Sequence, residues 1–320
     1  MSSPTDVPVH PAAPVPAAAT HGARRRRVAL LILALLVGVA GIVSIFTSSY
    51  HAFIDLDVYR LGVRQWLNGG DLYGSLPPTY VGIRLPFIYP PFAAIALSPL
   101  ALISWGMAGV LNFGISIAAL AVTGYLAVRR LWPACGRQGA LVVSGFALPL
   151  AVWVEPVRET IGFGQVNLVL MVLVAADCLV EKPRWPRGLL VGVAAAIKLT
   201  PAILLLYFLI RRDLRATVVT IVSGAVATVI GFVVLPSESV RYWFGGFAGA
   251  ASLSGSPYAT NQTIKAALVR LSLPQPVESG LWLLIAAVVL VAAAVGVWRA
   301  FGRSNIVLAM VVTSAAGLLL

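Results

Sequence analysis

Long apolar stretches alternate with short polar segments along almost the whole chain. The first apolar stretch follows Arg24–Arg27 and continues for about 20 residues to Thr47, which is enough to cross a bilayer. No small-residue cleavage site precedes Tyr50, so the pattern predicts a retained signal anchor. Residues 1–27, rich in Pro and Ala before the arginines, are predicted to be a disordered cytoplasmic tail with a basic anchor.

The remainder, residues 28–320, is predicted to be one multi-span domain. After the anchor, the apolar stretches cover residues 92–128, 139–154, a segment ending near Glu181, 188–210, 216–235, 281–298 and 304–320. Pro99 and Ser104 divide the first of these, which predicts either one span preceded by a half-buried piece or two spans.

Residues 188–210 have basic residues on both sides, Lys182–Arg187 before and Arg211–Arg215 after. The positive-inside rule would keep both flanks in the cytoplasm, which a single crossing does not allow. We therefore favour a re-entrant hairpin broken at Pro201, with Lys198 near its tip, over a kinked span.

The same rule places the polar segments 48–91, 155–167 and 236–280 outside the cytoplasm. In the first of them a helix is predicted from Asp55 to Leu67, where Asn68-Gly69-Gly70 signals a helix end. Carboxylates and cations from distant parts of the sequence would then meet at one membrane interface.

Composition agrees with this picture, since 59% of the residues are hydrophobic, 11% are charged and the mean hydropathy is +0.93. The fold class is therefore all-α, a polytopic bundle of transmembrane helices. The net charge of +12 is attributed to the positive-inside bias and anionic lipids, and no nucleic-acid partner is predicted. Cys135 and Cys178 fit neither a disulfide framework nor a metal site, and the three histidines are too far apart for one.

Lys198 is the most informative single residue, because a charge inside an apolar stretch costs at least a few kcal/mol. Such a residue needs an anionic partner, and the chain has only 11 acidic side chains. A lipid phosphate is the leading hypothesis, and Asp177 or an aspartate of the first outer segment is the alternative.

Asp55 and Asp57 are the candidates for catalysis, because a partly buried carboxylate outside a span can act as a general base. The alternative is structural, with Asp55 as the helix N-cap and Asp57 favoured by the helix dipole. Two carboxylates are too few for a magnesium site, so no metal is predicted.

Arg158 can bind a phosphate through its guanidinium group, and Gln165 and Asn167 can bind hydroxyls. The alternative for Arg158 is an ion pair with Glu155 or Glu159. The segment Phe87–Phe92 combines an interfacial aromatic belt with a rigid proline pair, and Asn261-Gln262-Thr263 opens an amphipathic interfacial helix.

Motifs for ATP hydrolysis, dinucleotide binding, serine hydrolysis and zinc hydrolysis are all missing from the sequence. These reaction classes therefore have no support.

An ordered set of short motifs carries a family resemblance. The motifs are Asp55-Leu-Asp-Val-Tyr59, Gly70-Asp-Leu-Tyr73, Phe87-Ile-Tyr-Pro-Pro-Phe92, Gly164-Gln-Val-Asn167, Lys198-Leu-Thr-Pro201 and Asn261-Gln-Thr with Arg270. Together they resemble the actinobacterial polyprenol-phosphate-mannose-dependent α-(1→2)-mannosyltransferases of the GT-C fold, glycosyltransferase family 87, over residues 28–320. Members typically continue with a Ser-Pro-x-Ser-Trp-x-His-His segment, so we expect the domain to extend past residue 320.

The resemblance implies a multi-pass protein of the plasma membrane with an extracytoplasmic active site and short interfacial helices in its outer loops. It implies an inverting transfer of mannose from polyprenyl monophosphate mannose to phosphatidylinositol mannosides or lipomannan-type acceptors, without a cofactor. Asp55 matches the family's base, and Asp57 ranks second.

Combined with the residues above, this gives two sets of candidate contacts. Donor phosphate would be bound by Arg158 and Lys198 first, with Arg270 and Arg64 behind. Substrate groups would be bound by Tyr59, Tyr89, Gln165, Asn167, Asn261 and Gln262. The alternatives are an arabinofuranosyltransferase of the same fold, a transporter or lipid flippase, and a structural scaffold subunit.

Overall fold

The computed structural model describes residues 18–47, 53–245 and 261–319, and every regular element in those ranges is a helix. Most of the predicted tail, residues 1–17, lies outside the described residues, as do His51 and residues 246–260. The first helix begins at Ala18, ten residues before the predicted domain start.

Helices of three kinds make up the fold. The long ones are α1 (Ala18–Thr47), α4 (Trp105–Leu131), α10 (Leu214–Val234) and α14 (Gln275–Gly302). Shorter apolar ones are α3 (Pro91–Leu102), α5 (Gly136–Ala151), α7 (Asn167–Leu179), α8 (Leu189–Ile197), α9 (Leu204–Ile210) and α15 (Ile306–Leu319), with 3-10 turns at Pro133–Cys135 and Thr200–Ile203. Four short helices carry most of the remaining polar residues: α2 (Ile54–Leu67), α6 (Glu155–Phe163), α11 (Pro236–Phe244) and α13 (Ile264–Arg270).

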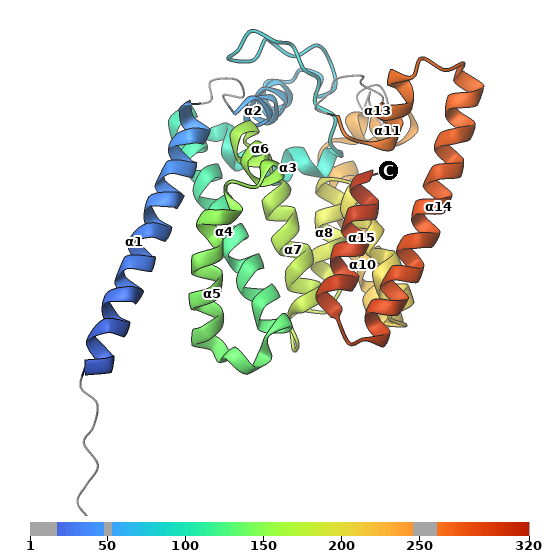
Figure 1. Cartoon of the computed structure of the whole chain (residues 1–320). Coiled ribbons are helices and arrows are strands. Elements are labelled where there is room, and N and C mark those ends of the chain that lie inside the picture. The colour runs from blue at the N-terminus through green and yellow to red at the C-terminus, as the bar shows by residue number, and fades with distance from the viewer. Residues whose placement is uncertain (1–17, 48–52, 246–260, 320) are drawn as a thin grey trace, which may run out of the picture.

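The chain is a multi-pass, all-α membrane protein, as the hydropathy pattern predicted. The four long helices are long and apolar enough to cross a membrane, and a fifth span is possible if the bent pair α5 and α6 counts as one. Figure 1 shows α4, α5, α7, α8, α10 and α15 side by side, with α1 on the outside against α5 and the short helices α2, α3, α11 and α13 at one end.

The apolar stretch 92–128 divides at Ser104, whose Oγ accepts a hydrogen bond from Met107 N at 3.3 Å and caps α4. The result is one span, α4, preceded by the 12-residue helix α3. Of the two predicted arrangements, the structure has the one in which a shorter segment precedes a single span. Pro99 lies inside α3 and does not end it.

The stretch 188–210 is a re-entrant hairpin. Val191 at the start of α8 and Tyr207 near the end of α9 belong to the same buried cluster around Cys178. The chain therefore returns to the end of the bundle from which it entered, and Lys198 lies at the turn, directly after α8. Arg130 at the end of α4 donates to Leu179 O at this same basic end.

The opposite end of the bundle is built around a second buried cluster, to which Tyr59, Phe87 and Tyr89 belong. Here α2 lies across α3, because Arg60 donates to the carbonyls of Leu100 and Ile103, the latter at 2.9 Å. These carbonyls end a helix and have no partners within it, and a cation also suits the negative end of the helix dipole.

Candidate active site

Asp55 lies in the first turn of α2 and points to the segment that joins α6 to α7. The N-cap of α2 is Phe53, with no capping side chain, so the structural alternative in which Asp55 is the N-cap does not hold. Its Oδ2 instead accepts a hydrogen bond from Gln165 Nε2 at 2.5 Å. The carboxylate is thus bound across 110 positions of sequence rather than within its own helix.

Gly164 makes this contact possible. It ends α6 with a φ of 72°, a left-handed conformation that favours glycine. A Cβ atom at this position would lie 2.8 Å from Leu56 Cβ and 3.0 Å from a ring carbon of Phe53. Only a residue without a side chain lets α6 approach α2 this closely, and Gln165 follows at once.

A continuous chain of hydrogen bonds connects Asp55 to Lys198. Gln165 donates to Asp55, Asn167 Nδ2 donates to Gln165 Oε1 at 2.5 Å, and Lys198 Nζ donates to Asn167 Oδ1 at 3.0 Å. The predicted alternative partner of Lys198, Asp177, instead bonds Trp185 and the amide of Val191 at the basic end of the bundle. Lys198 therefore faces the first-segment aspartate through two amides.

The direction of every bond in this chain is fixed by its two ends. An ammonium group only donates and an ionised carboxylate only accepts, so each amide must turn its oxygen toward Lys198 and its nitrogen toward Asp55. Amides do not exchange protons readily, so the chain orients and polarises the two charges rather than passing a proton between them. A ligand that separates the two amides would find an acceptor on one side, Gln165 Oε1, and a donor on the other, Asn167 Nδ2.

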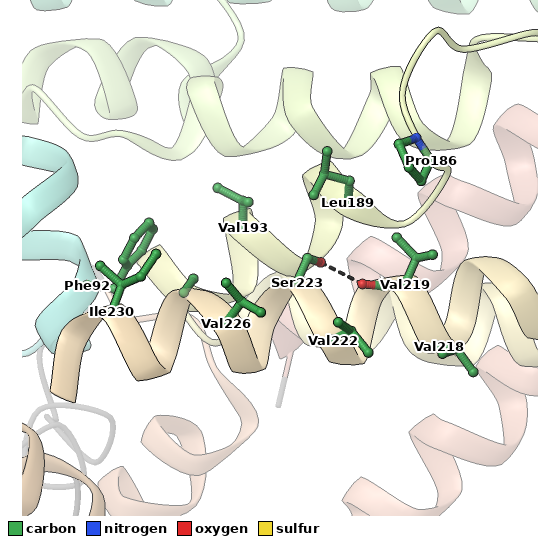
Figure 2. Close-up of a pocket in the computed structure, with 11 residues that line it drawn as sticks. Phe92, Pro186, Leu189, Val193, Val218, Val219, Val222, Ser223, Val226 and Ile230 are labelled. Carbon is green, nitrogen blue, oxygen red and sulfur yellow. Dashed lines mark hydrogen bonds between the residues drawn. The ribbon is translucent and has the colours of Figure 1, made fainter. Parts of the chain in front are cut away.

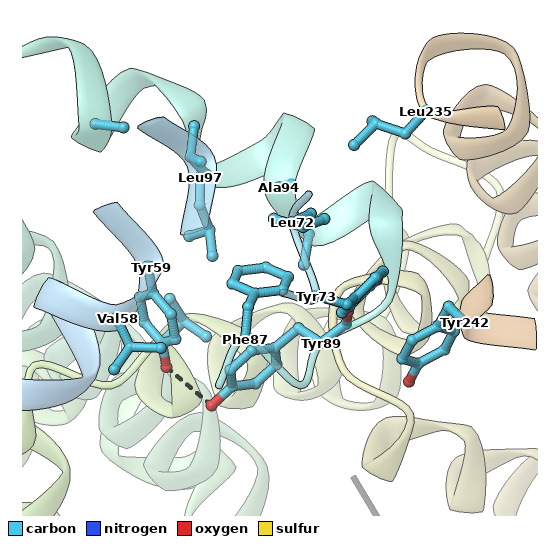
Figure 3. Packing of buried hydrophobic residues seen from close by; sticks show 14 of the residues in the cluster. Val58, Tyr59, Leu72, Tyr73, Phe87, Tyr89, Ala94, Leu97, Leu235 and Tyr242 are labelled. Carbon is cyan, nitrogen blue, oxygen red and sulfur yellow. Dashed lines mark hydrogen bonds between the residues drawn. The ribbon is translucent and has the colours of Figure 1, made fainter. Parts of the chain in front are cut away.

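Two tyrosines cover this chain. Lys198 Nζ lies 5.6 Å from the ring centroid of Tyr89, a cation–π distance, and the hydroxyls of Tyr59 and Tyr89 are 3.1 Å apart (Figure 3). Burial raises the pKa of both hydroxyls, and the negative charge of Asp55 raises it further. Both tyrosines therefore stay neutral hydrogen-bonding groups.

Tyr73 supports this aromatic layer, and sequence analysis did not identify it as a site residue. Its hydroxyl donates to the carbonyl of Tyr89 at 2.8 Å, and its ring stacks on Tyr242 with centroids 5.7 Å apart. The available signal was its place in the motif Gly70–Tyr73, but the motif alone does not reveal the partner.

The depth of this chain of polar groups follows from the length of α7. α7 begins at Asn167 and has 13 residues, so it is about 20 Å long. The hydrocarbon core of a bilayer is about 30 Å thick. With the basic loop 180–188 at the membrane surface, Asn167 and Lys198 would lie about 10 Å below the other surface.

The other predicted site residues have different surroundings. Asp57 Oδ2 accepts a hydrogen bond from Tyr80 N at 2.7 Å, which ties the loop after α2 to that helix. Arg64 Nε donates to Ala101 O at 2.9 Å, so it caps α3 together with Arg60. Arg158 lies 3.5 Å from Glu159, the ion pair expected under its structural alternative.

The third polar segment carries α13 and the residues that cap it. Arg270 donates to Asn261 O at 2.9 Å, and Asn261 Oδ1 accepts from the hydroxyl and amide of Thr263, which caps α13. Gln262 is exposed beside them. Within the described ranges, no three side chains among His, Cys, Asp and Glu gather as a metal site requires.

Comparison with known proteins adds a family and named relatives. The model of glycosyltransferase family 87 matches residues 87–320. The chain is 40% identical over 258 residues to a polyprenol-phosphate-mannose-dependent α-(1-2)-phosphatidylinositol mannoside mannosyltransferase of Mycolicibacterium smegmatis, covering 77% of this chain and 58% of that protein. It is 38% identical over 306 residues to a protein of the same name from Mycobacterium tuberculosis, covering 92% of this chain and 72% of that one.

Another relative has a name that specifies a phosphatidylinositol pentamannoside as its acceptor. This is a polyprenol-phosphate-mannose-dependent α-(1-2)-phosphatidylinositol pentamannoside mannosyltransferase of Mycobacterium tuberculosis, 35% identical over 305 residues, covering 93% of this chain and 68% of that protein. The chain thus spans between about half and three quarters of the length of these relatives. No solved structure matches it.

Proposed function

The chain belongs to glycosyltransferase family 87, and we propose that it transfers mannose from a polyprenyl monophosphate donor to a phosphatidylinositol mannoside, forming an α-(1→2) linkage. The donor and acceptor are those in the names of its relatives. The observation that carries the proposal is the chain of hydrogen bonds that joins Asp55 to Lys198 at one end of the helix bundle.

In the proposed reaction, Asp55 removes the proton from the 2-hydroxyl of the acceptor mannose. That oxygen forms a bond to the anomeric carbon of the donor, and the bond from this carbon to the phosphate oxygen breaks. The electron pair leaves with polyprenyl phosphate, and the configuration inverts from β in the donor to α in the product. A general base of this kind contributes roughly 10²–10⁴-fold to the rate.

Lys198 is proposed to bind the donor phosphate and to stabilise the charge that builds on it as the sugar leaves. Its ammonium group lies against the Tyr89 ring in a partly buried position, where a fixed charge acts more strongly than in water. Arg158 is the second candidate, on the neighbouring helix α6 with a partly exposed guanidinium group. Arg64 and Arg270 rank behind them, because Arg64 donates to Ala101 O and Arg270 donates to Asn261 O.

Binding of substrate is proposed to open the chain of amides. Gln165 and Asn167 would exchange their bond to each other for bonds to sugar hydroxyls, which both donate and accept as amides do. Tyr59 and Tyr89 offer neutral hydroxyls and an aromatic face beside them. Asp57, Asn261 and Gln262 stay lower-ranked candidates.

We place this site on the extracytoplasmic side of the plasma membrane. Arg130, Lys182, Arg187 and Arg211 are associated with the end of the bundle opposite to Asp55, and basic residues favour the cytoplasmic side. A lipid-linked sugar, unlike a sugar nucleotide, is a donor that can be used on the outer side.

The test is a transfer assay with the full chain in membranes, labelled polyprenyl-phosphate mannose and a panel of phosphatidylinositol mannosides. Mannose in an α-(1→2) linkage, detected by linkage analysis of the product, is the expected result. A parallel reaction with a polyprenyl-phosphate arabinofuranose donor separates the two sugars, and transfer of arabinose alone would overturn the proposal. Movement of labelled lipid between leaflets of proteoliposomes without a new glycosidic bond would identify a flippase instead.

A further inference from the structure

A groove on the membrane-facing side of the bundle runs between α8 and α10. Its volume is about 410 Å³, and it is lined by Phe92, Pro186, Leu189, Val193, Val218, Val219, Val222, Ser223, Val226, Ala227 and Ile230 (Figure 2). Val218, Val222, Val226 and Ile230 follow each other at every fourth position of α10, so they form one stripe about 18 Å long.

The groove offers nothing to a polar ligand. Its one side-chain hydroxyl belongs to Ser223, which donates to Val219 O at 2.7 Å and is within 3.2 Å of Thr220 O. All other lining side chains are apolar. Whatever occupies the groove inside the membrane must therefore be hydrocarbon.

One end of the groove lies next to the site described above. Phe92 closes that end, and it follows Tyr89, whose ring covers Lys198, by three residues. On the opposite wall, Val193 belongs to α8, and the helix ends at Ile197, directly before Lys198. α10 is held against this corner because Gly231 packs on Pro91 and the amide of Phe92.

We infer that this groove holds the isoprenoid tail of the donor lipid, with the phosphate at the Phe92 end beside Lys198. The inference rests on the proposed function for the identity of the donor. Its own support is that an uncharged apolar groove ends at Phe92, three residues from the Tyr89 ring that lies over Lys198. An apolar groove with a cation near one end matches a long hydrocarbon chain that ends in an anion. The acceptor's sugar would then approach from the Asp55 side.

The expected effect of blocking the groove is moderate. A tail that leaves the groove enters lipid, which is equally apolar, so only packing and alignment of the phosphate are lost. The Val222→Trp variant fills the middle of the groove. Val229→Trp is the matched control, since Val229 is on the same helix and 58% exposed against 53% for Val222, but does not line the groove.

The experiment measures transfer by the full chain from two mannosyl donors, one with a long polyprenyl tail and one with a tail of two isoprene units. We expect Val222→Trp to raise the KM for the long donor roughly five- to tenfold and to leave the short donor within about twofold, because only the long tail reaches position 222. Val229→Trp should leave both donors unchanged. Equal effects of the two variants, or equal losses with both donors, would overturn the inference.

A binding measurement keeps the inference separate from the proposed function. A polyprenyl phosphate without sugar, carrying a photoreactive group on its tail, is crosslinked to the wild-type protein and the labelled peptides are mapped. Labels on residues 186–193 and 218–230 that excess phosphatidylglycerol does not displace support the groove even if no mannose is transferred. Labelling of other residues would overturn the inference. Displacement by phosphatidylglycerol would also overturn it, because the groove would then hold ordinary membrane lipid.

Discussion

Two polar clusters lie at opposite ends of the α7–α8 pair, and they use similar groups in different ways. At the basic end, Asp177 accepts hydrogen bonds from Trp185 Nε1 at 2.8 Å and from Val191 N at 2.9 Å. At the other end, Asp55 is bound by Gln165, and the chain continues through Asn167 to Lys198.

The partners of Asp177 lie 8 and 14 positions away in sequence, and one of them is a main-chain amide at the start of α8. These donors are fixed by the loop, and the carboxylate is completely buried. The partners in the other cluster are all side chains from different elements, and each side chain can rotate to another partner. The comparison suggests that the first cluster holds the hairpin in place, and the second is the one a substrate can enter.

The largest expected effect is on activity, from Asp55→Asn. An asparagine can still accept from Gln165 through its oxygen, so folding should be kept, but the base is lost and kcat should fall by roughly 10²–10⁴. Two quantities are measured: the rate of mannose transfer at saturating donor and the thermal unfolding midpoint in detergent.

Asp57→Asn is its matched control, since the new side chain can still accept from Tyr80 N. The transfer activity of this variant should stay within about threefold of wild type, because the substitution keeps the hydrogen bond and leaves the Asp55 carboxylate in place. If the Asp57 variant loses activity and the Asp55 variant keeps it, the two aspartates have been assigned the wrong way round.

The second effect is expected from Lys198→Met. Loss of the cation should lower kcat/KM by roughly 10²–10³, as for removal of one group that stabilises transition-state charge. Stability should change little, because methionine removes the cost of a partly buried charge but leaves Asn167 Oδ1 without its donor. Transfer kinetics and unfolding midpoints measure both, and Lys198→Arg should keep part of the activity. A marked loss of stability would show that the lysine is structural.

The smallest effect on activity is expected from Asp177→Asn. The NH₂ group of the new asparagine would face a hydrogen-bond donor, either Trp185 Nε1 or Val191 N, and that donor would lose its acceptor. The protein should therefore lose roughly 1–3 kcal/mol of stability. Activity per folded molecule should change less than about threefold, because Asp177 lies at the end of the bundle opposite to the proposed site.

The control is Asp213→Asn, where the side chain caps α10 by accepting from Ala216 N. Asparagine caps a helix about as well as aspartate, so stability should hardly change. If Asp177→Asn removed activity while stability stayed the same, the division of labour between the two clusters would be refuted.

Several features of the fold were predictable from local patterns. The helix at 54–67 and the division at Ser104 follow from signals within a few residues of each other, since capping groups and glycines act over short distances. The hairpin with Lys198 at its turn follows from the basic residues on both sides of residues 188–210.

The candidate site was predictable only as a set of residues. Asp55 and Asp57 are two positions apart on a helix, so their side chains point about 200° apart around its axis. Residue type alone does not separate them as bases, and the family resemblance ranks Asp55 first. The packing of α2 against α6 at Gly164 decides that Asp55 faces Gln165 while Asp57 faces Tyr80.

By itself, the sequence determined that this is a multi-pass helical protein, where its membrane segments lie, and that a lysine in the hairpin needs an anionic partner. The tertiary structure alone decided which acid faces that lysine, that two amides lie between them, and that Arg64 is engaged at the end of α3. The physical reason is the sequence distance over which each signal acts. Hydrophobic periodicity and helix caps act within a few residues, whereas contacts across 31 and 110 positions exist only once the helices have packed.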